Sequence, residues 1–341
     1  MLNANAHKNF TAVGDKEANA LLTDVLLEMQ EMFAGTHLSV YLGGSYGRGD
    51  GGVRQDRENG ILYNDLDFFV FARESSGEDE KILKEIAEKY EKILKVDVDF
   101  SRIMSVRDIR KNEKRLMMQE LKRGYHHVCG EDLLEKYLPE LPAEELPFSE
   151  VCRLLLNRGM GLLFAGEKIA NDSPDTDFIL RNIYKAVLGA GDGMLIAEGR
   201  YRWHIAERLN LIEETDLSAE RKNFYREAVA FKSSPHRRKH EDMTAFWNSI
   251  RDFFCEMLLC CAGNGNLRCA LYDRCRKSGE LSLKNFVKYC LKSRTFPLKN
   301  WKFYTMPATA VLLEDVYSAL KTMPEKTDRK SKLYQLWLIF N

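Results

Sequence analysis

Paired acidic residues at two places in the first third of the chain are the clearest sign of chemistry. Asp65 and Asp67 open an apolar run, and Asp97 and Asp99 stand in a segment that alternates apolar and acidic residues. Residues two apart on a strand share a face, so each pair projects its carboxylates side by side. Adjacent carboxylates repel one another unless a cation lies between them. Carboxylates from two neighbouring strands would form an all-oxygen site suited to Mg²⁺, and two such ions can hold both the attacking and the leaving oxygens of a phosphoryl displacement.

A glycine-rich turn precedes the first acidic pair. Residues 43–49 read GGSYGRG and follow a short apolar segment. Glycines let backbone N–H groups come close to phosphate oxygens, and Ser45 adds a hydroxyl donor. Arg48 either neutralises phosphate charge or lies at the surface. The turn and the carboxylates together predict a site for a phosphate-bearing substrate.

Strand patterns in the first third of the chain would position these residues. Short apolar or alternating runs predict strands within residues 37–42, 61–72 and 95–103. Apolar residues at helical spacing predict helices over residues 15–33 and 78–94. The combination predicts a small mixed sheet with flanking helices.

The pattern changes after about residue 145. Three prolines (Pro139, Pro142 and Pro147) mark a linker, and helical periods then continue to the end of the chain. These periods cover residues 151–169, 177–197, 219–232, 244–261 and 307–322. We therefore expect an α+β protein with two domains, a mixed-sheet core at 1–145 and an all-helical bundle at 146–341.

The order of these motifs resembles the DNA polymerase beta-like nucleotidyltransferase superfamily. The resemblance covers residues 35–103: Gly44-Ser45, then Asp65-Leu66-Asp67 opening an apolar strand, then Asp97 in a later strand. It implies that Asp65 and Asp67 bind two Mg²⁺ ions, and that Asp97 is the third carboxylate that helps to activate the attacking hydroxyl. It also implies that Gly44 and Ser45 hold the β- and γ-phosphates of a nucleotide.

Two departures from the superfamily pattern leave alternatives open. Nineteen residues separate Ser45 from Asp65, more than is usual there, so residues 50–63 resemble a polar insertion that could shape acceptor choice. The third strand carries two aspartates, so Asp99 replaces or assists Asp97, and either or both would bind metal.

The helical part is similar to the bundle that follows this core in bacterial nucleotidyltransferases. That similarity points to residues 181–185, RNIYK, with glycines following at 189–193, as the place for a basic residue that contacts phosphate. Lys185 is the residue we select, which makes it a cofactor-binding candidate together with Gly44, Ser45 and Arg48.

The resemblance implies a magnesium-dependent nucleotidyltransferase. It would move a nucleoside monophosphate from a nucleoside triphosphate to an acceptor hydroxyl and release pyrophosphate. A small molecule, an RNA end and a protein side chain all remain open as the acceptor, with a small molecule favoured. The alternative is a non-catalytic nucleotide-binding or antitoxin-like regulatory module on the same fold.

Other functions find less support in the sequence. Residues 47–52 match GxGxxG, but the polar residues that follow lack the helical period of a dinucleotide-binding motif. There is no GxxxxGK[ST] motif for a P-loop ATPase, and the six cysteines after residue 250 form no CxxC pair that would indicate zinc. No run of 18 apolar residues occurs and the first twenty residues lack the apolar core of an export signal, so we expect a cytoplasmic protein with reduced thiols and no membrane partner.

Charge is balanced overall, with 51 Lys and Arg against 51 Asp and Glu, which argues against non-specific coating of nucleic acid. Residues 274–302 are the exception, with nine Lys or Arg, one Glu and several interleaved aromatics. Two interpretations fit this segment. It holds RNA phosphates and stacks bases, or it is a helix with a solvated basic face and its aromatics in the core.

Overall fold

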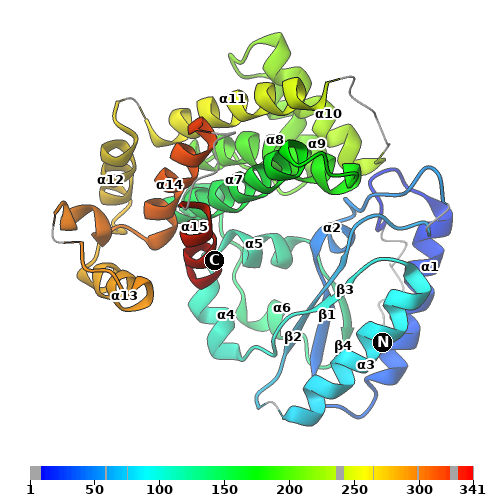
Figure 1. Ribbon diagram of the computed structural model, residues 1–341. Helices are drawn as coiled ribbons and strands as arrows, with labels where there is room; N and C mark the ends of the chain where they lie inside the picture. Colours follow the sequence, from blue (N-terminus) through cyan, green and yellow to red (C-terminus); the bar gives the residue numbers. More distant parts are fainter. Residues whose placement is uncertain are drawn as a thin grey trace. The chain divides into compact units, whose positions relative to one another are not determined.

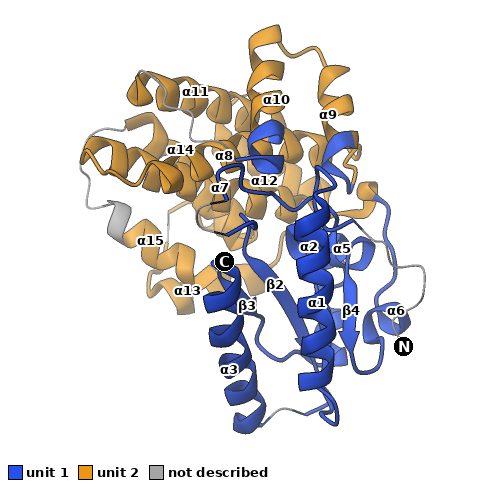
Figure 2. Cartoon of the chain, turned by 90° about the vertical axis from the view of Figure 1, so that its right-hand side faces the viewer, with its two compact units in different colours: residues 1–142, 203–206, 229–236 blue, residues 143–202, 207–228, 237–341 orange. Residues whose placement is uncertain are grey.

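The protein is described here from a computed structural model, which covers residues 9–57, 60–74, 76–235, 242–263, 265–297, 299–322 and 329–340. These residues form an α+β fold, with one small four-stranded mixed sheet and many helices (Figure 1). The predicted α+β class with a small mixed sheet is therefore confirmed, and the nucleotidyltransferase identity of the core stays a prediction. The chain divides into two compact units (Figure 2). Unit 1 comprises Met1–Pro142, Trp203–Ala206 and Val229–His236, and unit 2 comprises Ala143–Arg202, Glu207–Ala228 and Arg237–Asn341.

The sheet of unit 1 has the strand order β3-β2-β1-β4. Its strands are β1 (Ser39–Leu42), β2 (Leu66–Phe71), β3 (Val98–Phe100) and β4 (His126–Cys129). β2 and β3 are parallel, whereas β1 runs antiparallel to both β2 and β4. β1, β2 and β3 lie inside the three predicted strand segments. β4 is not predicted, because its four residues, HHVC, show no clear alternation of apolar and polar side chains.

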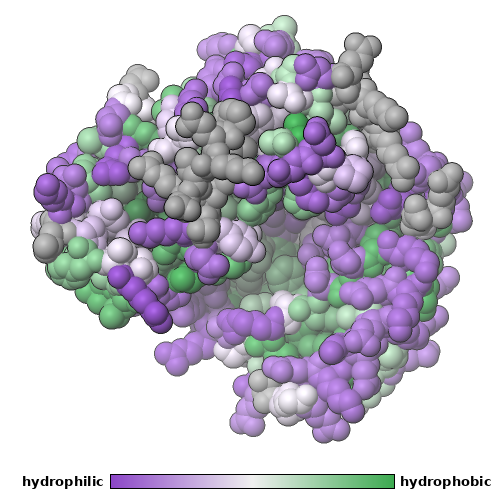
Figure 3. All heavy atoms as spheres, in the orientation of Figure 1, coloured by the Kyte–Doolittle hydropathy of each residue, from purple (hydrophilic) through white to green (hydrophobic). Residues whose placement is uncertain are grey.

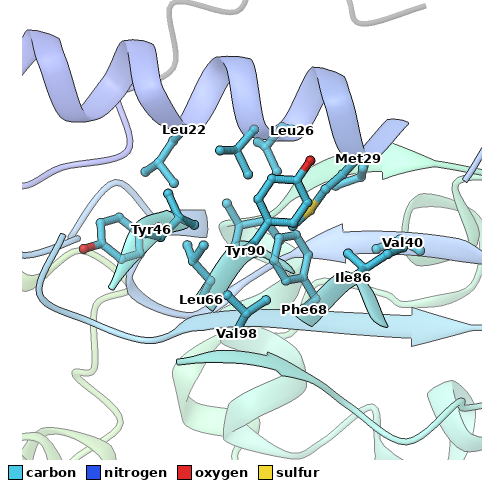
Figure 4. Packing of buried hydrophobic residues seen from close by; sticks show 14 of the residues in the cluster. Leu22, Leu26, Met29, Val40, Tyr46, Leu66, Phe68, Ile86, Tyr90 and Val98 are labelled. Atoms are coloured by element: carbon cyan, nitrogen blue, oxygen red, sulfur yellow. The ribbon is translucent and has the colours of Figure 1, made fainter. Parts of the chain in front are cut away.

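One face of the sheet is covered by α1 (Lys16–Met32) and α3 (Gly77–Leu94). α1 lies within its predicted segment, and α3 begins one residue before its own, at Gly77. The apolar stripe of each helix is buried against the strands. Asp15 and Ser76 cap the two helices by accepting backbone N–H bonds in the first turn. Figure 4 shows the side chains that meet there, Leu22, Leu26 and Met29 from α1, Ile86 and Tyr90 from α3, and Val40, Leu66, Phe68 and Val98 from the strands.

The other face of the sheet packs on three short helices, α4 (Val106–Asn112), α5 (Leu116–Arg123) and α6 (Leu133–Tyr137). Tyr41 of β1 and Phe71 of β2 lie at the centre of this second cluster, with ring centroids 5.7 Å apart. The Tyr41 hydroxyl donates to the Glu131 carbonyl and accepts the Leu133 N–H, so the start of α6 is fixed to the sheet.

Unit 2 is built from helices throughout its described residues. α7 packs against α8 and α14, and α8 also packs against α11. The two 3₁₀ helices are η1 (Ala143–Glu145) and η2 (Trp301–Thr305). The α-helices are α7 (Phe148–Ala170), α8 (Thr176–Ala197), α9 (Ile205–Glu213), α10 (Ala219–Ser233), α11 (Met243–Ala262), α12 (Leu267–Lys277), α13 (Leu283–Ser293), α14 (Ala308–Thr322) and α15 (Arg329–Phe340), of which the start of α9 and the end of α10 belong to unit 1. Among the described residues, none of the helices combines the length and the apolar composition needed to cross a bilayer.

A buried ion pair lies inside unit 2. The Arg208 Nε atom is 3.0 Å from Asp192 Oδ1, and Arg208 Nη1 donates to the Tyr201 hydroxyl at 3.1 Å. The Tyr225 hydroxyl donates to the same Asp192 oxygen at 2.7 Å. Each charge therefore has both an opposite charge and a hydrogen-bond partner, which offsets the cost of removing it from water.

Candidate functional site

The glycine turn lies directly against the first acidic pair. β1 ends at Leu42, and residues 44–47 form one helical turn, α2 (Gly44–Gly47). The Gly43 N–H donates to the Asp67 carbonyl at 2.8 Å, which fixes the turn to β2. Gly44 has φ +61°, and a Cβ atom there would lie 2.0 Å from Asp67 Oδ2. Only glycine fits this position, because both the backbone conformation and the adjacent carboxylate exclude a side chain.

The four predicted carboxylates lie on one face of two neighbouring strands. β2 and β3 pair in parallel with Asp67 opposite Asp99, and the Leu66 N–H donates to the Asp97 carbonyl at 2.9 Å. Leu66 points into the core between the sheet and α1 and α3, so Asp65 and Asp67 point to the opposite face. The same alternation places Asp97 and Asp99 on that face. The pairing of strands thus places on one sheet face two acidic pairs that are 32 residues apart in the sequence.

Negative charge accumulates at this edge of the sheet. Partial withdrawal of the Asp99 carboxyl from water raises its pKa, and the charges of Asp65, Asp97 and Glu91 raise that pKa further. Asp65 and Asp67 are half-buried, whereas Asp97 and Asp99 are exposed. Asp99 therefore lies within electrostatic reach of both acidic pairs, which is the property that a cation site needs.

Tyr46 connects the glycine turn to the segment that leads into β2. Its buried hydroxyl donates to the Gly52 carbonyl at 2.8 Å and accepts the N–H groups of Tyr63 and Asn64 at 3.0 and 3.3 Å. These bonds close the base of the predicted insertion, residues 50–63, of which 58 and 59 lie outside the described residues. Tyr46 is not among the predicted site residues, because its partners are backbone groups that no sequence motif reveals.

Arg48 has internal partners. Its Nη1 atom is 3.3 Å from Glu120 Oε2, and its Nε atom is 3.9 Å from Asp50 Oδ2. Lys232 Nζ lies 3.8 Å from the same Asp50 oxygen. The Arg48 side chain is mostly buried, so this geometry gives it a structural role in holding the loop after α2. A contact between Arg48 and phosphate stays a prediction.

Lys185 lies on α8 in unit 2, so it belongs to a different compact unit from the carboxylates. It is half-buried, and Gly189 follows one turn later on the same side of the helix. A Cβ atom on Gly189 would lie 2.3 Å from Cγ of Arg158 on α7, so the stem of Arg158 crosses α8 next to Lys185. The Arg158 side chain is a second cation on this helix pair, and the sequence analysis did not identify it. Gly189, on which its stem packs, was the one sequence feature that could have pointed to it.

The carboxylates fit magnesium by their chemistry. Across the residues that the structure describes, no three Asp, Glu, His or Cys side chains stand close enough to enclose a metal ion as they are placed. The donor set is nevertheless all oxygen, as Mg²⁺ prefers, and it comes from adjacent strands. Comparison of the chain with protein-family models and with curated protein sequences finds no match.

Proposed function

We propose that this protein is a magnesium-dependent nucleotidyltransferase, which moves a nucleoside monophosphate from a nucleoside triphosphate to an acceptor hydroxyl and releases pyrophosphate. One observation carries the proposal. Asp67 is paired with Asp99 across two parallel strands, and its carboxylate also lies against Gly44 of the glycine turn. The acidic edge of the sheet and the glycine turn are thereby adjacent, which supports a site that would bind a cation and a phosphate side by side.

Asp65 and Asp67 are the residues that would hold Mg²⁺, with Asp97 or Asp99 completing the set. Bound Mg²⁺ would supply charge neutralisation for the triphosphate and would acidify the acceptor hydroxyl. Gly44 leaves room beside the Asp67 carboxylate, and the half-exposed Ser45 offers a hydroxyl donor to phosphate oxygens.

Asp97 or Asp99 would be the third carboxylate, which completes the metal site and favours the deprotonated acceptor hydroxyl. Partial withdrawal from water and the charges of Asp65, Asp97 and Glu91 raise the pKa of Asp99, so this carboxylate lies in the negative field that a bound cation would neutralise.

Lys185 of unit 2 stays our candidate for a basic residue that contacts phosphate. Lys185 and Arg158 lie on neighbouring helices, and the Arg158 stem passes over Gly189. Two positive charges on one helix pair can bind the negative charge of a triphosphate or of departing pyrophosphate. A small molecule with a hydroxyl group is the acceptor that we favour.

The test is calorimetric binding of ATP, CTP, GTP and UTP, each with and without Mg²⁺. The wild type is compared with the Asp65→Asn/Asp67→Asn double variant. The matched control is Glu85→Gln/Glu88→Gln, which also removes two negative charges but on the exposed side of α3. We expect Mg²⁺-dependent binding of at least one nucleotide in the wild type and the control, and its loss in the aspartate variant.

Pyrophosphate release in the presence of a panel of hydroxyl-bearing acceptors then tests transfer itself. Binding that needs neither Mg²⁺ nor the two aspartates would refute the enzymatic proposal and leave a nucleotide-binding regulatory module. Absence of binding for all four nucleotides would refute both. Pyrophosphate release that persists in the aspartate variant would place the chemistry elsewhere in the chain.

A further inference from the structure

α13 carries an apolar stripe on its outer side. Leu283, Val287 and Leu291 are spaced four residues apart, so they lie on one face of the helix. The opposite face packs inward through Tyr289, which is buried and contacts the rings of Tyr304 and Phe340. The helix therefore uses one apolar face for the core of unit 2 and presents a second one to solvent.

Two aromatic residues extend this stripe. The rings of Phe296 and Trp301 lie 5.5 and 6.1 Å from the ring of Phe286, which is on the edge of α13 next to the stripe. The five side chains together form what we call the α13 face, and each is between 50% and 75% exposed (Leu283, Val287, Leu291, Phe296 and Trp301). The sequence allowed the aromatic residues of this basic segment to lie in the core. That prediction is confirmed for Tyr289 and is wrong for Phe296 and Trp301.

Positive charge borders the α13 face. Lys284, Lys288 and Lys292 each follow a stripe residue by one position, so they form a parallel row about 100° around the helix. Residues 281–302 contain six Lys or Arg and no Asp or Glu, although the whole chain has no net charge. Figure 3, in the orientation of Figure 1, shows hydrophobic and hydrophilic residues side by side where α13 lies.

We propose that the α13 face binds the surface of an anionic lipid bilayer. Aliphatic residues on one side of a helix, with lysines beside them, are the composition of helices that lie in the plane of a membrane interface, and the aromatic rings of Phe296 and Trp301, which follow α13 in the chain, add to that apolar side. The long stems of Lys284 and Lys288 can lie along the apolar boundary while their ammonium groups reach lipid phosphates, whereas the Lys292 ammonium donates to the Ile339 carbonyl at 3.2 Å. This mode needs no spanning segment and is independent of the proposed nucleotide chemistry.

A single-stranded RNA would explain the α13 face less completely. It would use the lysines and could stack bases on Phe296 and Trp301, but it would leave Leu283, Val287 and Leu291 in water. An interfacial site accounts for both classes of residue, because the aliphatic side chains leave water together with the aromatic rings. The observations therefore favour lipid, and RNA becomes an outcome of the test.

The experiment is co-sedimentation of the full chain with vesicles of phosphatidylcholine containing phosphatidylglycerol, and with vesicles of phosphatidylcholine alone. We expect binding to the anionic vesicles that weakens as salt rises. The variant Leu283→Ser/Leu291→Ser should lower partitioning about tenfold or more, since it removes two large apolar side chains from the interface. Each of Lys284→Gln and Lys288→Gln should lower it about fivefold, because a lysine near an anionic surface contributes roughly 1 kcal/mol.

Matched controls carry the same substitutions on α3. Ile93 is an exposed apolar residue and Lys84 an exposed lysine, so Ile93→Ser and Lys84→Gln should leave partitioning unchanged. On vesicle binding, tryptophan emission should shift to shorter wavelength, and Trp301→Phe should remove that shift. Circular dichroism checks that the variants fold, which substitutions at exposed positions should permit.

Three outcomes would overturn the proposal. These are the absence of binding to anionic vesicles, equal binding to neutral vesicles, and loss of binding in the α3 controls to the same extent. A single-stranded RNA oligonucleotide that binds through the same lysines, in the absence of vesicle binding, would assign the face to nucleic acid instead.

Discussion

Replacement of Tyr46 by phenylalanine should destabilise unit 1 through the loss of a single oxygen atom. The ring of Tyr46 is fully buried in the core beneath the sheet, and phenylalanine keeps that packing. What is lost is the hydroxyl that bonds to Gly52, Tyr63 and Asn64. The substitution therefore separates hydrogen bonding from packing.

The expected cost is about 2 kcal/mol rather than the sum of three bonds. The Tyr63 N–H also donates to the Gly52 carbonyl at 3.2 Å, so these two groups keep each other as partners. The Asn64 N–H loses the hydroxyl acceptor, and an unsatisfied group of this kind costs roughly 1–3 kcal/mol. The substitution removes the bonds of the hydroxyl to Gly52 and Tyr63, which still bond to each other, and leaves the Asn64 N–H without this acceptor. The summed cost falls in that range.

The measurement is urea unfolding followed by circular dichroism, combined with hydrogen exchange of residues 50–66. Because a protein with two compact units need not unfold in one step, exchange is needed to assign the loss to this segment. Tyr90→Phe is the control: Tyr90 is equally buried, but its hydroxyl donates to the exposed carboxylate of Glu28, so the change should cost less than about 1 kcal/mol. A cost for Tyr46→Phe no larger than for Tyr90→Phe, or unchanged exchange over residues 50–66, would refute the reasoning.

Four further outcomes are expected. Gly44→Ala should lower the free energy of unfolding in urea by more than about 2 kcal/mol, because the new Cβ atom would clash with the Asp67 carboxylate at a backbone conformation that alanine disfavours. Gly35 also has a positive φ but open space around it, so Gly35→Ala should cost about 1 kcal/mol. Asp99→Asn should raise the urea midpoint at neutral pH by relieving like-charge repulsion, and this gain should vanish in acid and shrink when Mg²⁺ is added. Arg208→Met should cost about 3–5 kcal/mol, because it leaves a buried carboxylate without its partner. The free energy of unfolding should fall as pH rises above about 10, because burial raises the pKa of Tyr46. Above that pH the unfolded chain releases a proton that the folded protein retains, so Tyr46→Phe should flatten the dependence.

Each of these has an outcome that contradicts it. Equal costs for the two glycine variants would show that the Asp67 carboxylate can move away from a side chain at position 44 at little cost in free energy. A lower midpoint for Asp99→Asn at neutral pH would mean that attraction rather than repulsion dominates its surroundings. A cost near zero for Arg208→Met would mean that the buried pair only balances its own desolvation. An alkaline profile identical in wild type and Tyr46→Phe would remove this tyrosine as a contributor.

The sequence carries most of the information about the first three strands and little about how they pair. Apolar runs and alternation locate β1, β2 and β3, because burial of one or both strand faces imposes those patterns. The spatial order of the strands depends on pairings between distant segments. The adjacency of Asp67 and Asp99 is therefore an expectation from the sequence and an observation only in the structure. The four residues of β4 show no clear alternation of apolar and polar side chains, and its pairing with β1 contains a register shift.

The candidate site divides in the same way. Residue types and spacing identify Gly44 and the aspartates, because the chemistry of phosphate and cations demands those groups. Such reasoning does not identify Tyr46 or Arg158. The Tyr46 hydroxyl bonds to backbone groups, and the Arg158 side chain packs on a glycine of another helix, and neither contact leaves a motif in the sequence. Exposure is equally hard to foresee, as Tyr289 and Trp301 occur in one basic segment and have opposite environments.

Unit 1 is assembled from three separate stretches of the chain, and this has a consequence for its biosynthesis. The Val53 N–H donates to the Ser233 carbonyl, and the ring of Tyr63 packs on Phe231. A ribosome must therefore make residues 229–235 before the loop beside the candidate site can close. We expect a fragment that ends at residue 142 to lack these contacts, so the loop beside the candidate site would not be held in its observed position. During translation, the contacts of Val53 and Tyr63 can form only after residues 229–235 are made, nearly a hundred residues after Pro142.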